Sequence, residues 1–142
     1  MKYYYEEITF STSKRFEIRD ISEKVYEIFQ KSGIKNGLIL VFAPHATAAI
    51  ILNENENGLK NDILNILKEL VPPEDKYMHD IYDNNAHAHI LSSIIKPFVI
   101  LPIKDGKIIR GTWQNIMFIE LDGPRSLRRV VVIVMGEWKL TK

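Results

Sequence analysis

The chain has 142 residues, 46% of them hydrophobic, which is enough for one ordinary core, and we expect a single domain over residues 1–142. Its 19 basic and 18 acidic side chains leave a net charge of +1, which argues against nucleic acid or an anionic membrane as a partner. Because the chain has no cysteine, disulfides and thiolate metal sites are excluded, and any transition-metal ligands must be His and carboxylate side chains.

The first residues, MKYYYEEITF, lack the apolar core of a secretion signal, and no apolar run approaches the ~20 residues of a membrane span. We therefore expect a soluble, cytoplasmic protein. The abundance of Ile, Lys and Glu is typical of proteins from hot habitats.

The chain begins with two β-type patterns followed by a helical one. Residues 3–10 and 15–20 are rich in β-favouring side chains and are separated by the polar STSK, which predicts a hairpin. Apolar residues then recur at helical spacing over 21–33, where Asp20 can cap the start and Gly33 supplies a stop.

The nearly continuous apolar runs at 37–43 and 48–53 predict two strands, joined by PHAT, with both faces covered. Leucines and isoleucines at 59–70 predict a second amphipathic helix, which ends at Pro72-Pro73. A polar connection that carries His79 follows.

The second half begins with a third predicted helix, capped by Asn84 or Asn85 and ending before Pro97. Everything after this helix has the pattern of strands and turns, in a long antiparallel meander. Strands, helices and then a run of strands indicate an α+β domain rather than a doubly wound sheet.

Three of the four histidines fall in the segment HDIYDNNAHAHI. His87 and His89 are two residues apart, so a helix places them on nearly opposite sides and makes them a poor chelating pair. Asn85 lies one turn before His89 on the same face, while His87 is expected to point elsewhere, toward solvent. Histidines are also ordinary surface and cap residues, so a structural role for this segment stays open.

Two connections beside the predicted central strands carry further polar candidates. His45 lies in PHAT at a strand end, where rigid elements often hold functional groups, and an imidazole there can bind metal or exchange a proton. Glu54 and Asn55 follow the strand at 48–53. The segment NENENG fits a solvated turn or a helix cap equally well.

Glu120 interrupts an apolar stripe on the predicted strand QNIMFIELD. A buried carboxylate must be paired or hydrogen-bonded and is a site candidate, whereas a position at a sheet edge would make Glu120 an ordinary surface residue. The corner Gly111-Thr112-Trp113-Gln114 can shape a pocket wall, although Trp is more often a core residue.

The arginines are the obvious phosphate partners because their planar donor forks match phosphate oxygens. They are Arg110, Arg125, Arg128 and Arg129, of which Arg128-Arg129 also fits the solvated start of a strand. The Gly-rich phosphate loops, the HExxH zinc motif and the GxSxG elbow are all absent from the sequence.

Taken together, HATAAIILNEN, HDIYDNNAHAHI, LPIKDGKIIRGTWQNIMFIELDGPR and VVVIVMGE resemble the YjbQ-like family, also called the secondary thiamine-phosphate synthase family. The resemblance runs from about Phe10 to Glu137. It implies two packed, mainly antiparallel sheets in a homotrimer, and an activity that joins a pyrimidine pyrophosphate to a thiazole phosphate. That activity is regarded as weak or secondary.

The motifs of the family imply a set of pocket residues in this sequence. His87 lies where the family pattern is loose, and Ala46 replaces a hydroxyl residue that is common there. The residues carried over are His45, Thr47, Glu54, Asn55, His79, Asn85, His89, Thr112 and Gln114.

Our leading hypothesis is an enzyme pocket in which His45, His79 and His89 converge, with Glu54 nearby, on a small phosphorylated or anionic substrate. Three neutral imidazoles would suit a divalent metal ion such as Zn²⁺ or Mg²⁺, and imidazolium groups without metal could bind a phosphate. Two alternatives stay open. One is a non-catalytic trimer that binds a metal or a phosphometabolite, and the other is a structural polar cluster at a trimer interface.

Overall fold

The computed structural model describes residues 1–139, and it has the predicted α+β class with all three predicted helices. The helices are α1 (Ser22–Ser32), α2 (Asn57–Leu70), the short 3₁₀ helix η1 (Met78–Ile81) and α3 (Ala86–Ile95). The strands are β1 (Lys2–Thr12), β2 (Glu17–Asp20), β3 (Asn36–Phe42), β4 (Ala48–Asn53), β5 (Phe98–Lys104), β6 (Lys107–Ile108), β7 (Asn115–Glu120) and β8 (Arg125–Glu137).

The strands form two antiparallel sheets, of five strands in the order β1-β8-β3-β5-β6 and of three strands in the order β2-β7-β4. The predicted hairpin of β1 and β2 is wrong, because β1 pairs with β8 while β2 pairs with β7 in the other sheet. The predicted meander is also wrong, since β8 returns to lie between β1 and β3. The thirteen residues of β8 can pair with nearly all of β1, which the four residues of β2 cannot do.

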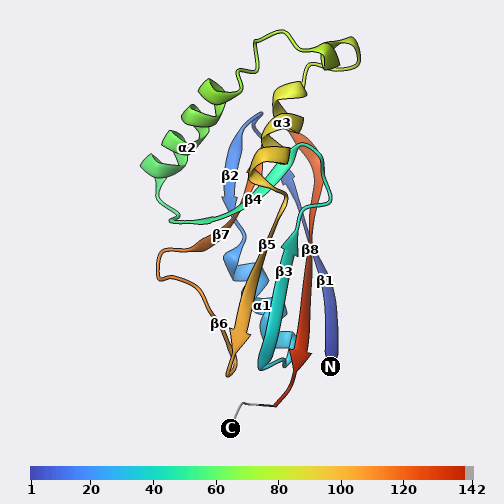
Figure 1. The fold of residues 1–142 in the computed structure, drawn as a ribbon, viewed down its shortest axis with the longest axis vertical. Helices are drawn as coiled ribbons and strands as arrows, with labels where there is room; N and C mark the ends of the chain where they lie inside the picture. Colours follow the sequence, from blue (N-terminus) through green and yellow to red (C-terminus); the bar gives the residue numbers. More distant parts are fainter. Residues whose placement is uncertain (140–142) are drawn as a thin grey trace.

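The molecule has three layers (Figure 1). The three-stranded sheet and α1 cover the inner face of the five-stranded sheet, and the core between them contains Val25, Ile39 and Phe118. The other face of the three-stranded sheet packs against α2 and α3, where Leu91 meets Ile119. Because β7 is buried on both faces, the functional groups at its ends are held by a rigid strand.

The helix ends follow local sequence signals. Gly33 ends α1 in the left-handed conformation with φ 68°, as its position predicts. The predicted cap of α1 by Asp20 is wrong, because Ile21 occupies the cap position without a side-chain cap; Asp20 instead accepts a hydrogen bond from the backbone N–H of Ser22 at 2.8 Å. The side chain of Glu56 caps α2 by accepting from the N–H groups of Gly58 and Leu59.

The outer face of the five-stranded sheet is uncovered in a single chain. The strand register sets Tyr5, Ile133, Leu40 and Ile100 side by side across four strands, and Ile100 is 51% exposed. The expectation that both faces of β3 are covered is therefore wrong for one face, because both covering elements lie on the inner side. None of the helices among residues 1–139 is both long and apolar enough to cross a membrane.

Candidate functional site

A buried carboxylate lies at the end of β7. Glu120 is fully buried and accepts hydrogen bonds from two guanidinium nitrogens of Arg128, from the Thr12 hydroxyl at 2.7 Å and from the Asp122 backbone N–H at 3.1 Å. Burial by itself would raise the pKa of this carboxyl, but the donors of Arg128, Thr12 and Asp122 outweigh it and hold the pKa below its usual value. The prediction that a buried Glu120 must be paired is confirmed.

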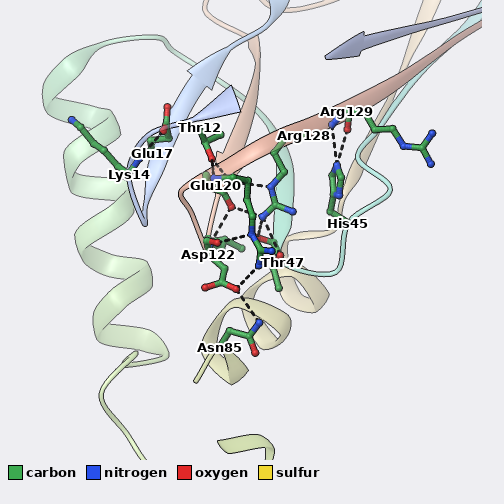
Figure 2. Close-up of polar contacts among 12 residues, drawn as sticks. Thr12, Lys14, Glu17, His45, Thr47, Asn85, Glu120, Asp122, Arg128 and Arg129 are labelled. Atoms are coloured by element: carbon green, nitrogen blue, oxygen red, sulfur yellow. Dashed lines mark hydrogen bonds and ion pairs between the residues drawn. The ribbon is translucent and has the colours of Figure 1, made fainter. Parts of the chain in front are cut away.

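Arg128 is 4% exposed, so its interpretation as a solvated strand start is wrong. Its Nη2 also donates to the Thr47 hydroxyl at 3.0 Å and to the Thr47 carbonyl at 3.3 Å. Alternation along β8 was the missed signal, because Arg128 falls on the same inward face as Val130 and Val132. The pair therefore joins β7 of one sheet to β8 of the other (Figure 2).

The polar network continues from this pair to the surface. Asp122 accepts from Nη2 of Arg125 at 2.8 Å and from Nδ2 of Asn85 at 2.9 Å. Because a carboxylate only accepts, the Asn85 atom that faces Asp122 is its amide nitrogen. Oδ1 of Asn85 then accepts from Nε2–H of His79 at 3.1 Å, which leaves the lone pair of this imidazole on Nδ1.

His79 and His89 lie edge to face, with ring centroids 4.8 Å apart. Asn85 precedes α3 and His89 follows one turn later, as the helical spacing predicts. Nδ1 of His79 and both ring nitrogens of His89 make no hydrogen bond within residues 1–139. We call His79, Asn85, His89 and Asp122 the α3 group; its imidazole nitrogens are available to exchange a proton or to contact a ligand.

His87 is 1% exposed, so the expectation that it points to solvent is wrong. Its ring packs against Phe16, with centroids 5.4 Å apart, and its Nε2–H donates to the carbonyl of Leu121 at 3.1 Å. The buried Nδ1 has no hydrogen-bond partner in the part of the chain that the structure describes. The side of α3 that carries His87 faces the three-stranded sheet, because Ala88 and Leu91 of the same helix pack into the hydrophobic core on that side.

His45 lies apart from the other two predicted pocket histidines. Its Nε2 is 3.0 Å from the backbone nitrogen of Arg129 and 3.1 Å from the carbonyl oxygen of that residue, so the β8 backbone engages it in either tautomer. Burial and the nearby Arg128 guanidinium lower the pKa of His45. In Figure 2 the ion pair of Glu120 and Arg128 lies between His45 on one side and Asn85 on the other.

The remaining candidates gather at the other end of β4 and β7. Glu54 and Asn55 follow β4, while Thr112 and Gln114 precede β7, and the register pairs Asn53 with Asn115 between them. We call Glu54, Asn55, Thr112 and Gln114 the Asn55 group.

Two features shape the Asn55 group. Arg110 holds the segment before β7 by donating to the carbonyls of Gly111 and Thr112. Asn55 donates to Asp20 at 3.0 Å and lines a cavity of about 670 Å³. Its other lining residues, three carboxylates among them, are Asp20, Ser22, Glu23, Tyr26, Glu27 and Gln30.

The two groups lie at opposite ends of one strand pair. Thr47 and Glu54 flank the six residues of β4, and a strand of this length separates them by about 20 Å. Within residues 1–139 no three His, Asp or Glu side chains are close enough to hold a metal ion together. The predicted metal site of His45, His79 and His89 is therefore not formed among the described residues of a single chain.

Comparison with known proteins places this architecture in a family. The family described as UPF0047 protein YjbQ-like matches residues 6–137. The chain belongs to the YjbQ-like UPF0047 family. A UPF0047 protein from Archaeoglobus fulgidus is 44% identical over 126 residues, which cover 89% of this chain and 97% of that protein. One from Methanothermobacter thermautotrophicus is 42% identical over 137 residues, covering 96% and 95%.

A solved YjbQ-like structure has the same fold. The crystal structure of a YbjQ-like protein of unknown function from Sulfolobus solfataricus P2 is 47% identical, has a TM-score of 0.95, and is matched over 96% of this chain and 99% of that one. Membership of the YjbQ-like family thus agrees with the sequence motifs and with the fold.

The buried pair makes a testable prediction for stability. Replacing Glu120 by Gln leaves the Arg128 guanidinium buried without its counter-charge, so we expect unfolding in urea at pH 7 to show a loss of about 3–5 kcal/mol. The double variant Glu120→Leu/Arg128→Met removes both charges and should lose less stability than the sum of the losses in Glu120→Leu and in Arg128→Met. Additive losses would contradict the pairing.

His87 predicts a pH dependence. Burial lowers its pKa in the folded state, so below about pH 6.5 the unfolded chain takes up the proton more readily and folding stability falls with the pH. His87→Gln keeps a donor for Leu121 but does not titrate. The free energy of unfolding of this variant should change less between pH 7.5 and 5 than that of the parent. The two slopes should differ by up to about 1.4 kcal/mol per pH unit. Identical slopes in both proteins would contradict this assignment.

Proposed function

We propose that this protein is a small-molecule enzyme whose site is completed between copies of the chain, with the α3 group of one copy facing the Asn55 group of another. The observation that supports the proposal is the separation of the candidates into two groups about 20 Å apart in one chain. A small substrate contacts both groups only if they come from different subunits. His45 and Thr47 then lie next to the buried ion pair of Glu120 and Arg128, and their role is to position the α3 group.

The α3 group suits the anionic part of a substrate. Nδ1 of His79 can take a proton, and its orientation is fixed because Asn85 holds Nε2–H and Asp122 holds Asn85. The side chain of Arg125 is 43% exposed beside them, and its guanidinium can donate to phosphate oxygens. We therefore expect a phosphorylated or anionic substrate to bind this group with its negative charge toward Arg125 and His79.

Carboxylates surround the Asn55 side of the site. Asp20, Glu23 and Glu27 line the same cavity as Asn55, so the electrostatic potential there favours a cationic or hydrogen-bond-donating ring. Thr112 and Gln114 add a hydroxyl and an amide at the same end of β4 and β7. The guanidinium of Arg125 beside the α3 group and the carboxylates beside the Asn55 group suit a substrate pair in which one part becomes positive while another leaves as an anion.

The secondary thiamine-phosphate synthase reaction has this charge pattern. The thiazole nitrogen forms a bond to the methylene carbon of the pyrimidine pyrophosphate, the bond from that carbon to the pyrophosphate oxygen breaks, and pyrophosphate leaves. The thiazole ring becomes a cation as the leaving group takes the negative charge. The carboxylates near Asn55 would stabilise the thiazole cation, and Arg125 with His79 would stabilise the departing pyrophosphate. A divalent metal would need a further ligand from a second copy to join His79 and His89.

The uncovered face of the five-stranded sheet is the surface that we assign to assembly. Contiguous apolar patches of this kind mark association surfaces. When the contact joins unlike ends of two subunits and its rotation closes, the subunits form a ring. We propose that the ring is a homotrimer, in which each of the three interfaces joins one α3 group to one Asn55 group.

The first test concerns the assembly. Ile100→Asp places a charge in the middle of the apolar outer face, where it cannot be paired, so light scattering should show mostly monomer instead of trimer. The matched control Lys104→Asp lies at the exposed end of the same strand and should keep the parent mass. A folded Ile100→Asp protein with the parent mass would exclude this face as the interface.

The second test is complementation between defective subunits. His79→Ala and Gln114→Ala should each abolish pyrophosphate release from the two thiamine precursors. Mixed trimers refolded from equal amounts should recover about a quarter of the parent activity, because a site that pairs two different chains is intact when each contributes its unaltered group. Mixtures as inactive as the separate variants would place both residues in one chain's site. A parent that binds both precursors without product would indicate a non-catalytic binding protein instead.

A further inference from the structure

A second cleft lies between α2 and the connection from β1 to β2. Its volume is about 510 Å³, which is in the range of small-molecule sites. It contains no member of the α3 group or the Asn55 group. The residues that line it are Lys14, Phe16, Glu17, Ile18, Asn57, Lys60, Asn61, Leu64 and Lys68.

The face of α2 that borders this cleft is rich in hydrogen-bond donors. Asn57, Lys60, Asn61, Leu64 and Lys68 recur at intervals of three and four residues, so they form one stripe along the helix. Two ammonium groups and two amides of α2 therefore face the cleft together, across from Lys14. This stripe is unlike a solvated helix face with mixed charges, because it carries no carboxylate.

The cleft carries an excess of positive charge, because three lysines and one carboxylate, Glu17, line it. Within residues 1–139 no ion pair joins Lys14, Lys60 or Lys68 to a carboxylate. Glu17 is the carboxylate on the wall, and its Oε1 accepts from the backbone N–H groups of Ser13 and Lys14, which closes the turn. Oε2 of Glu17 also lies 3.9 Å from Nη2 of Arg19, so this carboxylate has a cationic partner other than the lysines.

Phe16 gives the cleft an apolar floor. The ammonium group of Lys68 lies 4.9 Å from the centroid of the Phe16 ring, and Arg15 lies 5.8 Å from it. The same ring packs against the buried His87. The floor is therefore tied to the core through α3. Lys60 and Lys68 lie on α2 beside this fixed ring, and Lys14 lies in the turn between β1 and β2 that Glu17 closes.

We infer that this cleft binds a small phosphate-bearing anion, with Lys14, Lys60 and Lys68 contacting its oxygens. Three ammonium groups around one cavity match the charge of a diphosphate better than that of a single carboxylate, and the two asparagine amides supply further donors. The site is distinct from the proposed catalytic site and does not depend on it.

Calorimetric titration of the intact protein with inorganic pyrophosphate tests this inference. The variant Lys60→Gln/Lys68→Gln should bind about ten-fold more weakly or worse than the parent, and affinity should fall as salt is added. The control Lys24→Gln/Lys104→Gln removes the same charge from α1 and β5 and should bind as the parent does. None of the four lysines belongs to a hydrophobic core, so both double variants should fold. Thermal unfolding checks this.

Three results would overturn the inference. One is a parent protein that gives no heat of binding at low salt. The second is an equal loss in both double variants, which would reflect overall charge alone. The third is binding that survives Lys60→Gln/Lys68→Gln but disappears in His79→Ala, which would place the anion at the α3 group. Retention of binding in His79→Ala together with loss in the cleft variant supports the cleft even if the proposed enzyme activity is not found.

Discussion

The ion pair between Glu120 and Arg128 links the two sheets, from the last residue of β7 to the first part of β8. A buried pair of this kind contributes less to net stability than to position, because desolvation of both charges offsets much of their attraction. Its hydrogen bonds also fix Thr12, Thr47 and the backbone of Asp122. Asp122 in turn orients Asn85 and His79, so the outward chemistry of the α3 group depends on a charge pair at the centre of the fold.

The antiparallel pairing of β4 with β7 sets the second constraint. Residues that precede β4 lie beside residues that follow β7, and the residues that follow β4 lie beside those that precede β7. This topology brings each half of the candidate set together, and it keeps the halves apart within one chain. A site made between copies resolves the separation without moving either half, and the apolar outer face of the five-stranded sheet supplies a surface on which copies can meet.

Much of the fold followed from local pattern. The helices at α1, α2 and α3 and their ends were predictable because apolar spacing, Gly33 and Pro97 act over a few residues. The pairing of β1 with β8 was not, since contacts between distant strands depend on strand length and layer order rather than on adjacent sequence. Glu120 was identified as a break in an apolar stripe. Arg128 breaks the matching stripe on β8, and pairing the two breaks would have located the buried ion pair.

The site was only partly predictable for a related reason. Helical spacing placed Asn85 and His89 on one face, which the structure confirms, but it assigned His87 to solvent because nothing in the spacing reveals which face a neighbouring layer covers. The position of His45 depends on β8, more than 80 residues away. Motif resemblance gathers all these residues into one set, whereas the strand geometry divides them between two ends.

The central claim is that the α3 group of one copy lies next to the Asn55 group of another. Because the chain has no cysteine, Asn55→Cys and His89→Cys each introduce a unique thiol. The two single-cysteine proteins can be refolded together and treated with a short bis-maleimide, and the products separated under denaturing conditions. The account predicts a covalent dimer in the mixture, and far less dimer when either variant is treated alone. A mixture that stays monomeric, although the proteins are folded and assembled, would contradict it.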